Sequence, residues 1–325
     1  MERRPAHVVI SRLSETKGVP HMSISPIKID ELVINWHITE ACNYRCKYCF
    51  AAWEGCQNRP ELWRNESDSR TLLDSVHRFF SAQNSTDALR SHLSWSAVRL
   101  SLAGGEPTLL GKKLVRIGSH AKDLGFRLSL ITNGSKPDVV SEMAKYIDLL
   151  GISIDSVKQD ANAFIGRSDG KGQQISPSDL EKLIAQVRQN NPMIRIKLNT
   201  VVNAGNADND LSELIARTRP DRWKIMRMLP SITDALHIDR EAFWSFVRRH
   251  QDLGPVMSVE DNTDMTQSYL MIDPHGRFFQ NEAGRVGYAY SPPILEVGLG
   301  RALQHIDFQA SKFAARYPSS LVQEV

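Results

Sequence analysis

The sequence predicts an α/β fold in which parallel strands alternate with covering helices. From residue 32 onward, short runs rich in β-branched residues alternate with helical patterns, and several of these runs end in glycine or polar residues. Serial βα units imply parallel strands joined by right-handed crossovers. Six such units predict a doubly wound sheet or a barrel, complete or partial. In either arrangement a functional site lies at the carboxyl ends of the strands.

The predicted elements follow one another along the chain. Strands are expected over residues 32–39, 98–103, 128–132, 149–155, 194–202 and 222–229. Helices are expected over residues 71–80, 111–124, 137–147, 178–190, 210–218 and 239–250, with Asp239 as the N-cap of the last. Segments 268–273 and 277–281 flank Pro274-His275-Gly276, which predicts a hairpin.

These patterns divide the chain into three expected parts. Residues 1–30 contain helix-breaking proline and glycine and are interpreted as a flexible N-terminal arm. Residues 31–250 hold the six βα units. Residues 251–325 form a C-terminal extension that we expect to cap the site.

Composition excludes several classes of protein. The chain has 325 residues, 41% hydrophobic and 24% charged, and its net charge of +3 is too small to favour nucleic-acid or membrane binding by bulk electrostatics. There is neither a secretory signal nor a run of 18 apolar residues. Four cysteines, three of them within eight residues, do not form a disulfide framework. We therefore expect a cytoplasmic protein.

The cysteine triplet is the most specific motif. Cys42, Cys46 and Cys49 follow the first predicted strand with CxxxCxxC spacing. Three thiolates on one short loop can ligate three irons of a cubane [4Fe–4S] cluster and leave the fourth iron open to a reactant. The alternative is a structural zinc loop, which usually needs a second ligand pair that this chain lacks. Cys56 is interpreted as a small buried or partly exposed thiol.

Other strand ends carry signals of the same kind. Gly104-Gly105-Glu106-Pro107 follows the second strand, Asn133-Gly134 the third, and Ser153 and Asp155 close the fourth. Turns alone need glycine, asparagine and proline, so a structural role is the alternative at each position. Four successive polar strand ends together favour a site.

Period-two alternation predicts a polar lumen in the barrel. Because helices must cover the apolar face of each strand, the alternating polar side chains point inward. The inward set is Asn35, His37, Thr39, Arg99, Ser101, Arg195, Lys197, Asn199, Arg222 and Lys224. Several cations in one lumen favour a ligand with several negative charges, such as a phosphate chain. The alternative is that some of these side chains reach solvent.

The triplet followed by Gly-Gly-Glu-Pro resembles the radical S-adenosylmethionine (AdoMet) superfamily. The resemblance implies a partial (β/α)6 barrel in which AdoMet binds the open iron and yields a 5′-deoxyadenosyl radical. It implies that Gly105 and Glu106 border the methionine amino group and that the Tyr48–Phe50 backbone borders adenine. Asn133, Ser153 and Arg167 match positions that line the AdoMet site.

A closer resemblance, to viperin-like enzymes, extends from residue 33 to about residue 300. It rests on Asn35-Trp36-His37, Cys42-Asn43-Tyr44-Arg45-Cys46, Ile152-Ser153-Ile154-Asp155-Ser156, Phe164-Ile165-Gly166-Arg167, the 197–203 run, Arg222-Trp223-Lys224 and the 268–273 run. Such enzymes abstract the ribose 4′ hydrogen of a nucleoside triphosphate and release the 3′ hydroxyl as water. The product is a 3′-deoxy-3′,4′-didehydro nucleotide that stops viral or phage polymerases.

This resemblance also implies roles for individual residues. The triphosphate of ATP, CTP, GTP or UTP would be held by Lys197, Arg222, Lys224 and Arg99, with Asn35 and Asn199 nearby. The departing hydroxyl needs a proton, for which Tyr269 is the first candidate and His37 the second. Electrons would come from a donor such as flavodoxin or ferredoxin.

Two departures and two alternatives accompany the resemblance. The chain lacks the N-terminal amphipathic helix of animal viperins, and Ala103 stands where those proteins often have serine, so base preference cannot be transferred. The alternatives are another radical AdoMet enzyme, such as a molybdopterin-pathway cyclase or a peptide-modifying enzyme, or a non-catalytic phosphate-binding protein. The first two typically need cysteines beyond Cys56, and there are none.

Overall fold

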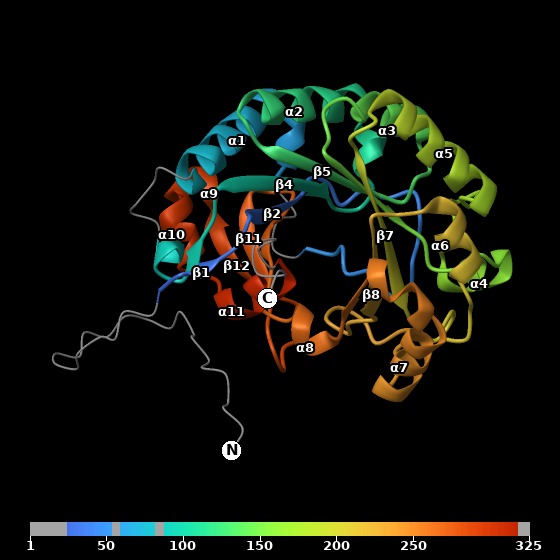
Figure 1. Ribbon diagram of the computed structural model, residues 1–325. Coiled ribbons are helices and arrows are strands. Elements are labelled where there is room, and N and C mark those ends of the chain that lie inside the picture. Colours follow the sequence, from blue (N-terminus) through green and yellow to red (C-terminus); the bar gives the residue numbers. More distant parts are fainter. Residues whose placement is uncertain (1–24, 54–58, 82–87, 318–325) are drawn as a thin grey trace, which may run out of the picture.

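Six parallel strands form a curved sheet at the centre of the molecule. The computed structural model describes residues 25–53, 59–81 and 88–317, and Figure 1 shows the strands around an open ring. Neighbours run parallel in the order β2 (Glu31–His37), β4 (Ala97–Ala103), β5 (Arg127–Thr132), β6 (Leu149–Ser153), β7 (Arg195–Val202) and β8 (Arg222–Arg227). The expected partial barrel is confirmed.

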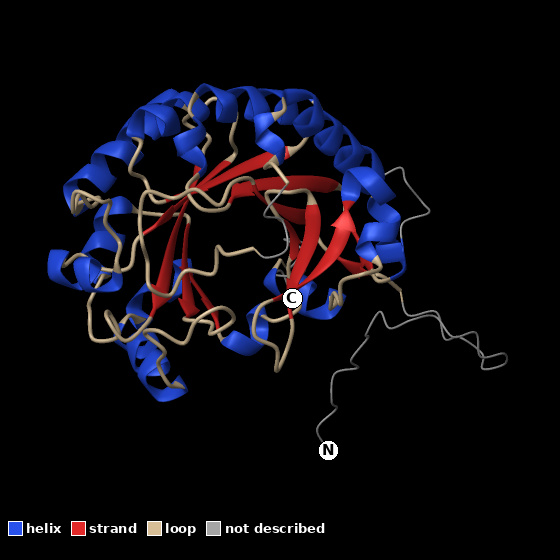
Figure 2. Ribbon diagram, turned by 180° about the vertical axis from the view of Figure 1, so that it is seen from behind, coloured by secondary structure: helices blue, strands red, loops and turns tan. Residues whose placement is uncertain are grey.

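Helices cover the outer face of this sheet, as Figure 2 shows. They are α1 (Glu66–Phe80), α2 (Lys112–Asp123), α3 (Pro137–Met143), α4 (Gln159–Ile165), α5 (Pro177–Asn190), α6 (Ser212–Thr218) and α7 (Arg240–Arg249). Helix α1 begins earlier than predicted because the Asn65 side chain caps it by accepting the Ser67 N–H at 3.0 Å. As predicted, Asp239 caps α7 by accepting the Ala242 N–H at 2.7 Å. The sequence pattern did not predict helix α4.

The C-terminal part of the chain lengthens the sheet at both edges. Strand β9 (Met257–Glu260) pairs in parallel with β8, while β10 (Leu270–Ile272) pairs in parallel with β2. Strand β11 (Arg277–Asn281) runs antiparallel to β10 and to β12 (Tyr288–Pro293), which confirms the predicted hairpin. Neither β9 nor the pairing of β10 with β2 has a signal in the sequence pattern. Both bring side chains from the extension to the barrel edges.

Short elements complete the described chain. They are β1 (Ile27–Lys28), β3 (Leu93–Ser94), η1 (Leu62–Arg64), η2 (Ala88–Ser91), η3 (Pro107–Leu110), η4 (Gln251–Val256), α8 (Asn262–Met265), α9 (Ile294–Val297), α10 (Leu299–Leu303) and α11 (Ala310–Arg316). Strand β1 lies within the predicted N-terminal arm and pairs with β3, so the end of that arm is ordered. Most of the arm and Cys56 lie outside the described residues. None of the described helices is long and apolar enough to cross a lipid bilayer.

The two faces of the central strands differ as the alternation predicts. Trp36, Leu100, Leu198 and Trp223 are almost fully buried in the core between sheet and helices. On the other face, the strand register places Gly151, Lys197 and Arg222 in one row and Ser153, Asn199 and Lys224 in the next. The polar rows therefore face the lumen.

Candidate active site

The loop that carries the three cysteines follows β2 at the carboxyl end of the strand, and backbone hydrogen bonds hold it from two sides. On one side, the Gly105 and Glu106 amides donate to the carbonyls of Thr39 and Ala41 at 2.7 and 2.8 Å. On the other side, the Arg45 and Lys47 amides donate to the carbonyls of Gly166 and Ile165 at 3.0 and 2.9 Å. The end of α4 therefore fixes the middle of the cysteine loop.

Two glycines make these close approaches possible. A Cβ on Gly105 would lie 2.3 Å from the Ala41 carbonyl oxygen, and a Cβ on Gly166 would lie 2.2 Å from the Arg45 carbonyl oxygen. Gly166 also has a φ of +89°, which side chains of L-residues rarely adopt. Any larger residue at either position would push the loop away.

Glu106 is fully buried beneath this loop and binds the end of β5. Its carboxylate accepts the Thr108 N–H at 3.0 Å, the Thr132 hydroxyl at 2.7 Å and the Asn133 N–H at 2.6 Å. Burial raises the pKa of Glu106, although these donors oppose the rise. The Asn133 amide in turn donates to the Asn43 side chain at 3.0 Å, which ties β5 to the cysteine loop.

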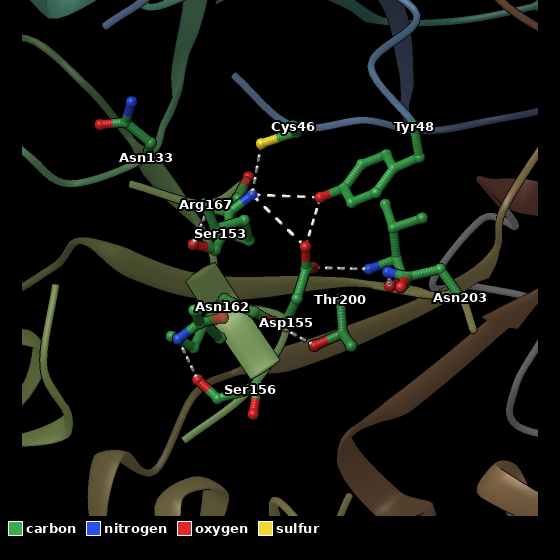
Figure 3. Close-up of polar contacts among 12 residues, drawn as sticks. Cys46, Tyr48, Asn133, Ser153, Asp155, Ser156, Asn162, Arg167, Thr200 and Asn203 are labelled. Carbon is green, nitrogen blue, oxygen red and sulfur yellow. Dashed lines mark hydrogen bonds and ion pairs between the residues drawn. The ribbon is translucent and has the colours of Figure 1, made fainter. Parts of the chain in front are cut away.

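A second buried cluster joins the cysteine loop to β6 (Figure 3). The Arg167 guanidinium donates to the Ser153 carbonyl at 2.7 Å and to the Tyr48 hydroxyl at 3.1 Å, and it lies 3.9 Å from the Cys46 sulfur. The Tyr48 hydroxyl donates to Asp155, whose carboxylate lies 3.5 Å from Arg167. Three of the predicted cofactor residues therefore meet directly beside the second cysteine.

Lys197 and Arg222 are cations without carboxylate partners among the described residues. Arg222 donates to the Ser258 hydroxyl at 2.6 Å, while no hydrogen bond or ion pair of Lys197 is found in the described part of the chain. Burial and the nearby Arg222 charge lower the pKa of Lys197 to about 8. The pair forms a positively charged site in the lumen, where the Glu260 charge opposes only part of the lowering of the Lys197 pKa.

Lys224 is instead paired with Glu260 of β9 at 2.9 Å. Glu260 also accepts the Tyr269 hydroxyl at 2.8 Å and three bonds from Arg316 of α11, at 2.8, 3.0 and 3.2 Å. Burial favours the neutral carboxyl, but Lys224 and Arg316 outweigh it and lower the pKa of Glu260 to about 2. One carboxylate thus connects β8, the residue before β10 and helix α11.

Arg99 is also neutralised within the protein. It forms a two-pronged ion pair with Glu31 and donates to the Ser129 hydroxyl at 3.1 Å. Its register position opposite Val33 places it farther from the carboxyl strand ends than Lys224. Glu31 and Glu260 therefore supply counter-charge for two of the lumen cations, Arg99 and Lys224.

The remaining predicted residues are Asn35 and His37 of β2 and Asn199 of β7. The Asn35 amide donates to the Leu270 carbonyl at 3.4 Å, while Asn199 is buried beside Ser153 and Lys224. The His37 ring packs edge-on against Phe50, Trp53 and Phe279 at centroid distances of 5.5, 5.5 and 5.1 Å. Burial lowers the pKa of His37 to about 3, so its imidazole is neutral at neutral pH.

Comparison with known proteins places this geometry in a family. The model of the radical SAM superfamily matches residues 36–218. An S-adenosylmethionine-dependent nucleotide dehydratase of Pseudoalteromonas ulvae is 43% identical over 300 residues, covering 92% of this chain and 96% of that protein. The chain belongs to the radical SAM superfamily. Within it, the chain belongs to the family of S-adenosylmethionine-dependent nucleotide dehydratases, the viperin-like enzymes.

Further comparisons agree with this radical SAM assignment. A nucleotide dehydratase of a Fibrobacter species is 35% identical over 319 residues, covering 92% of this chain and 91% of that protein. The solved structure of native anSMEcpe with bound AdoMet aligns with a TM-score of 0.58 at 13% identity, covering 88% of this chain and 82% of that one. The structural likeness supports the fold alone.

The residues of the radical SAM site fit the cofactors that characterise the family, a [4Fe–4S] cluster and AdoMet. Backbone N–H groups of Tyr44 and Ala51 point at the sulfurs of Cys42 and Cys49, each at 3.4 Å, an arrangement that suits thiolate ligands. No three Cys, His, Asp or Glu side chains of the described ranges converge on a single-ion site. A cubane cluster is wider than one ion, so its ligands need not meet at a point.

Sequence reasoning missed three residues that shape this radical SAM site. Asp155 closes the fourth predicted strand and belongs to the 152–156 run of the resemblance, but the sequence assigns it no role. Glu260 lies on the short strand β9, and Arg316 lies on α11. The Arg316 guanidinium stacks 3.4 Å from the centroid of the Tyr269 ring. A lone acidic residue and a lone arginine carry no local pattern, so no signal in the sequence could have paired them.

Proposed function

We propose that this nucleotide dehydratase acts on a nucleoside triphosphate and forms its 3′-deoxy-3′,4′-didehydro analogue. The observation that carries the proposal is the row of Lys197 and Arg222, two lumen cations without carboxylate partners among the described residues. Arginine and lysine side chains that face one buried space favour a ligand with several negative charges. A triphosphate provides such a ligand.

The lumen side chains differ in how they would bind the triphosphate. Lys197 and Arg222 would supply most of the positive charge, since Lys224 and Arg99 already have carboxylate partners. Lys224 would donate a further hydrogen bond to the triphosphate, on the side of the lumen that faces Tyr269. Asn35 and Asn199 would orient the nucleotide through their amides.

The cofactor residues would act from the cysteine side of the barrel. When bound by Cys42, Cys46 and Cys49, the cluster together with AdoMet supplies the radical that abstracts the ribose 4′ hydrogen. Gly105, Glu106, Asn133, Ser153 and Arg167, with the Tyr48–Phe50 backbone, would hold AdoMet. Their hydrogen bonds to the loop keep its position fixed relative to the lumen.

Loss of the 3′ hydroxyl as water requires a proton, and Tyr269 is the better placed donor. Its hydroxyl accepts from Lys224 at 3.0 Å, which links it to the proposed phosphate site. Burial raises the pKa of Tyr269 well above its usual range, so the phenol is protonated at neutral pH and can act as a proton donor. His37 is neutral in its aromatic surroundings and is therefore the weaker donor.

The proposal includes a setting for the reaction. A protein such as flavodoxin or ferredoxin would deliver the electrons in the cytoplasm, and the product would end chain synthesis by a viral or phage polymerase. Neither a molybdopterin-pathway cyclase nor a peptide-modifying enzyme gains support, because no cysteine follows Cys56. A non-catalytic phosphate-binding protein would not require the cysteine loop.

A comparison of substrates that differ in charge tests the proposal. Reconstituted protein receives AdoMet, dithionite and either a nucleoside triphosphate or the matching nucleoside, and nucleotides are analysed by mass spectrometry. We expect dehydration of the triphosphate alone and its loss in a Lys197→Ala, Arg222→Ala variant. Equal conversion of the nucleoside would contradict a triphosphate site.

A further inference from the structure

An exposed aromatic ring lies beside the cysteine loop and has no role in the proposed reaction. Phe164, on α4, is 53% exposed. The Lys47 ammonium lies 4.4 Å from the centroid of this ring. Lys47 stands between Cys46 and Cys49, so the two exposed side chains form one surface at the ligands of the cluster. We call Phe164 with Lys47 and Arg45 the loop patch.

Short contacts connect the loop patch to the cluster ligands. The Lys47 backbone N–H donates to the carbonyl of Ile165 at 2.9 Å, and Ile165 is the residue after Phe164. A Cβ on the next residue, Gly166, would lie 3.3 Å from the Cys46 Cα. In Figure 1 the loop after β2, drawn in blue, passes beside α4 before turning into the ring. The loop patch is therefore a surface close to the second cluster ligand.

The charge around the loop patch is predominantly positive. Arg45 and Lys47 are exposed, and the acidic side chains within residues 158–171 are Asp160 and Asp169. The Arg45 guanidinium donates to the backbone carbonyls of Cys42 and Tyr44. The Asp169 carboxylate accepts the backbone N–H groups of Lys171 and Gln173, at 2.9 and 2.8 Å, and so turns towards its own loop. Lys47 thus presents a cation beside one exposed aromatic ring.

We propose that the loop patch is the docking surface for a small acidic electron-carrier protein. This inference rests on the proposed function, which consumes electrons one at a time. Electron tunnelling weakens steeply with distance, so a carrier must dock where the cluster ligands approach the surface. Redox complexes are small, with an apolar centre and complementary charges at the rim, and the loop patch has this composition. One electron leaves the reduced carrier and enters the cluster, without transfer of any group.

Binding of an acidic flavodoxin tests the inference without relying on turnover. Titration calorimetry would compare the reconstituted wild-type protein with Lys47→Glu and Phe164→Ala. We expect both variants to bind at least about tenfold more weakly, the scale on which steering charges act, and we expect wild-type binding to weaken as salt rises. Lys182→Glu is the matched control, because Lys182 is exposed on α5 and its replacement by glutamate reverses the charge just as Lys47→Glu does. Equal loss in this control would overturn the inference.

Two reductants separate this inference from the proposed function. Dithionite is a small ion and needs no docking surface, so Phe164→Ala should form 5′-deoxyadenosine with it at a rate near wild type. With reduced flavodoxin, this variant should require about tenfold more carrier for half-maximal rate. If Phe164→Ala shows wild-type rates with both reductants, the docking role of the loop patch is excluded while the proposed function stands. A wild-type protein that cleaves no AdoMet with dithionite would overturn the proposed function together with the inference.

Discussion

Lys224 donates a hydrogen bond to the Tyr269 hydroxyl at 3.0 Å, although the two residues are 45 positions apart in the chain. Glu260 accepts from both, so the pair has a fixed orientation at the edge of the lumen. This relationship joins a cation of the proposed phosphate site to the proposed proton donor. The reaction can therefore be tested by changing either one.

Replacing Tyr269 by phenylalanine should separate AdoMet cleavage from dehydration. The ring and its stacking on Arg316 remain, whereas the hydroxyl is lost. We expect 5′-deoxyadenosine to form while the dehydrated nucleotide falls by about 100-fold or more, the usual contribution of a general acid. Mass spectrometry of both products measures the ratio. Parallel loss of both would mean that Tyr269 has another role, and His37→Gln serves as the comparison for the second candidate donor.

Removing the charge of Glu260 should destabilise the protein. Glu260→Gln leaves Lys224 and Arg316 buried with less compensation, and breaking such a network costs about 3–5 kcal/mol. Urea unfolding gives the change in free energy. Glu296→Gln is the control, because Glu296 is 56% exposed in its pair with Arg59 and should change stability by about 0–1 kcal/mol. Similar values for the two variants would contradict a structural network at Glu260.

The low pKa of Glu260 also predicts how stability depends on pH. Its pKa is about 2 in the folded protein, against 4.5 for a glutamate in water, so the unfolded chain binds a proton first as pH falls. The stabilising contribution of Glu260 is present above pH 4.5 and is lost between pH 4.5 and about pH 2. Urea unfolding across that range should show a smaller loss in Glu260→Gln than in the wild type.

Lys197 should make nucleotide binding sensitive to alkaline pH. Its pKa of about 8 means that the free protein loses this positive charge as pH rises through 8. We expect kcat/KM for the triphosphate to fall between pH 7 and pH 9. Lys197→Arg keeps the charge throughout that range and should remove much of the decline, whereas an identical profile would exclude Lys197 as its source.

Gly166 should be intolerant of a side chain. Alanine there would collide with the Arg45 carbonyl and adopt a left-handed backbone conformation, so the cysteine loop should detach from α4. We expect reduced iron content after reconstitution, measured by absorbance and iron analysis. Gly170→Ala is the control, since open space surrounds Gly170. Full iron content in Gly166→Ala would show that this contact is dispensable.

The alternation of residues was sufficient to predict parallel βα units with one polar strand face, whereas the partial barrel was implied by the resemblance to the radical AdoMet superfamily. Long βα units have strong local patterns. In a strand such as β7, residues two positions apart lie on the same face, so the numbering alone places Lys197 and Asn199 together. The cysteine spacing likewise specified where a cluster could form. These inferences depend on short-range periodicity, which the sequence records directly.

Other parts of the site depend on contacts that have no local signature. Strand β9 has four residues and α4 has seven, so neither has enough residues for a clear period. The bonds from Glu260 to Arg316 join positions 56 apart, and the pairing of β10 with β2 brings Asn35 within hydrogen-bond distance of Leu270, 235 positions away. Which carboxylate neutralises which lumen cation was therefore decided by tertiary packing.

The most direct test of the central claim follows one hydrogen atom. Reconstituted protein would be incubated without oxygen with AdoMet, dithionite and each of the four nucleoside triphosphates, deuterated at the ribose 4′ carbon. We predict that one or more nucleotides will lose the mass of a water and that the deuterium will appear in 5′-deoxyadenosine. Formation of 5′-deoxyadenosine without deuterium, and with every nucleotide unchanged, would contradict the proposed reaction.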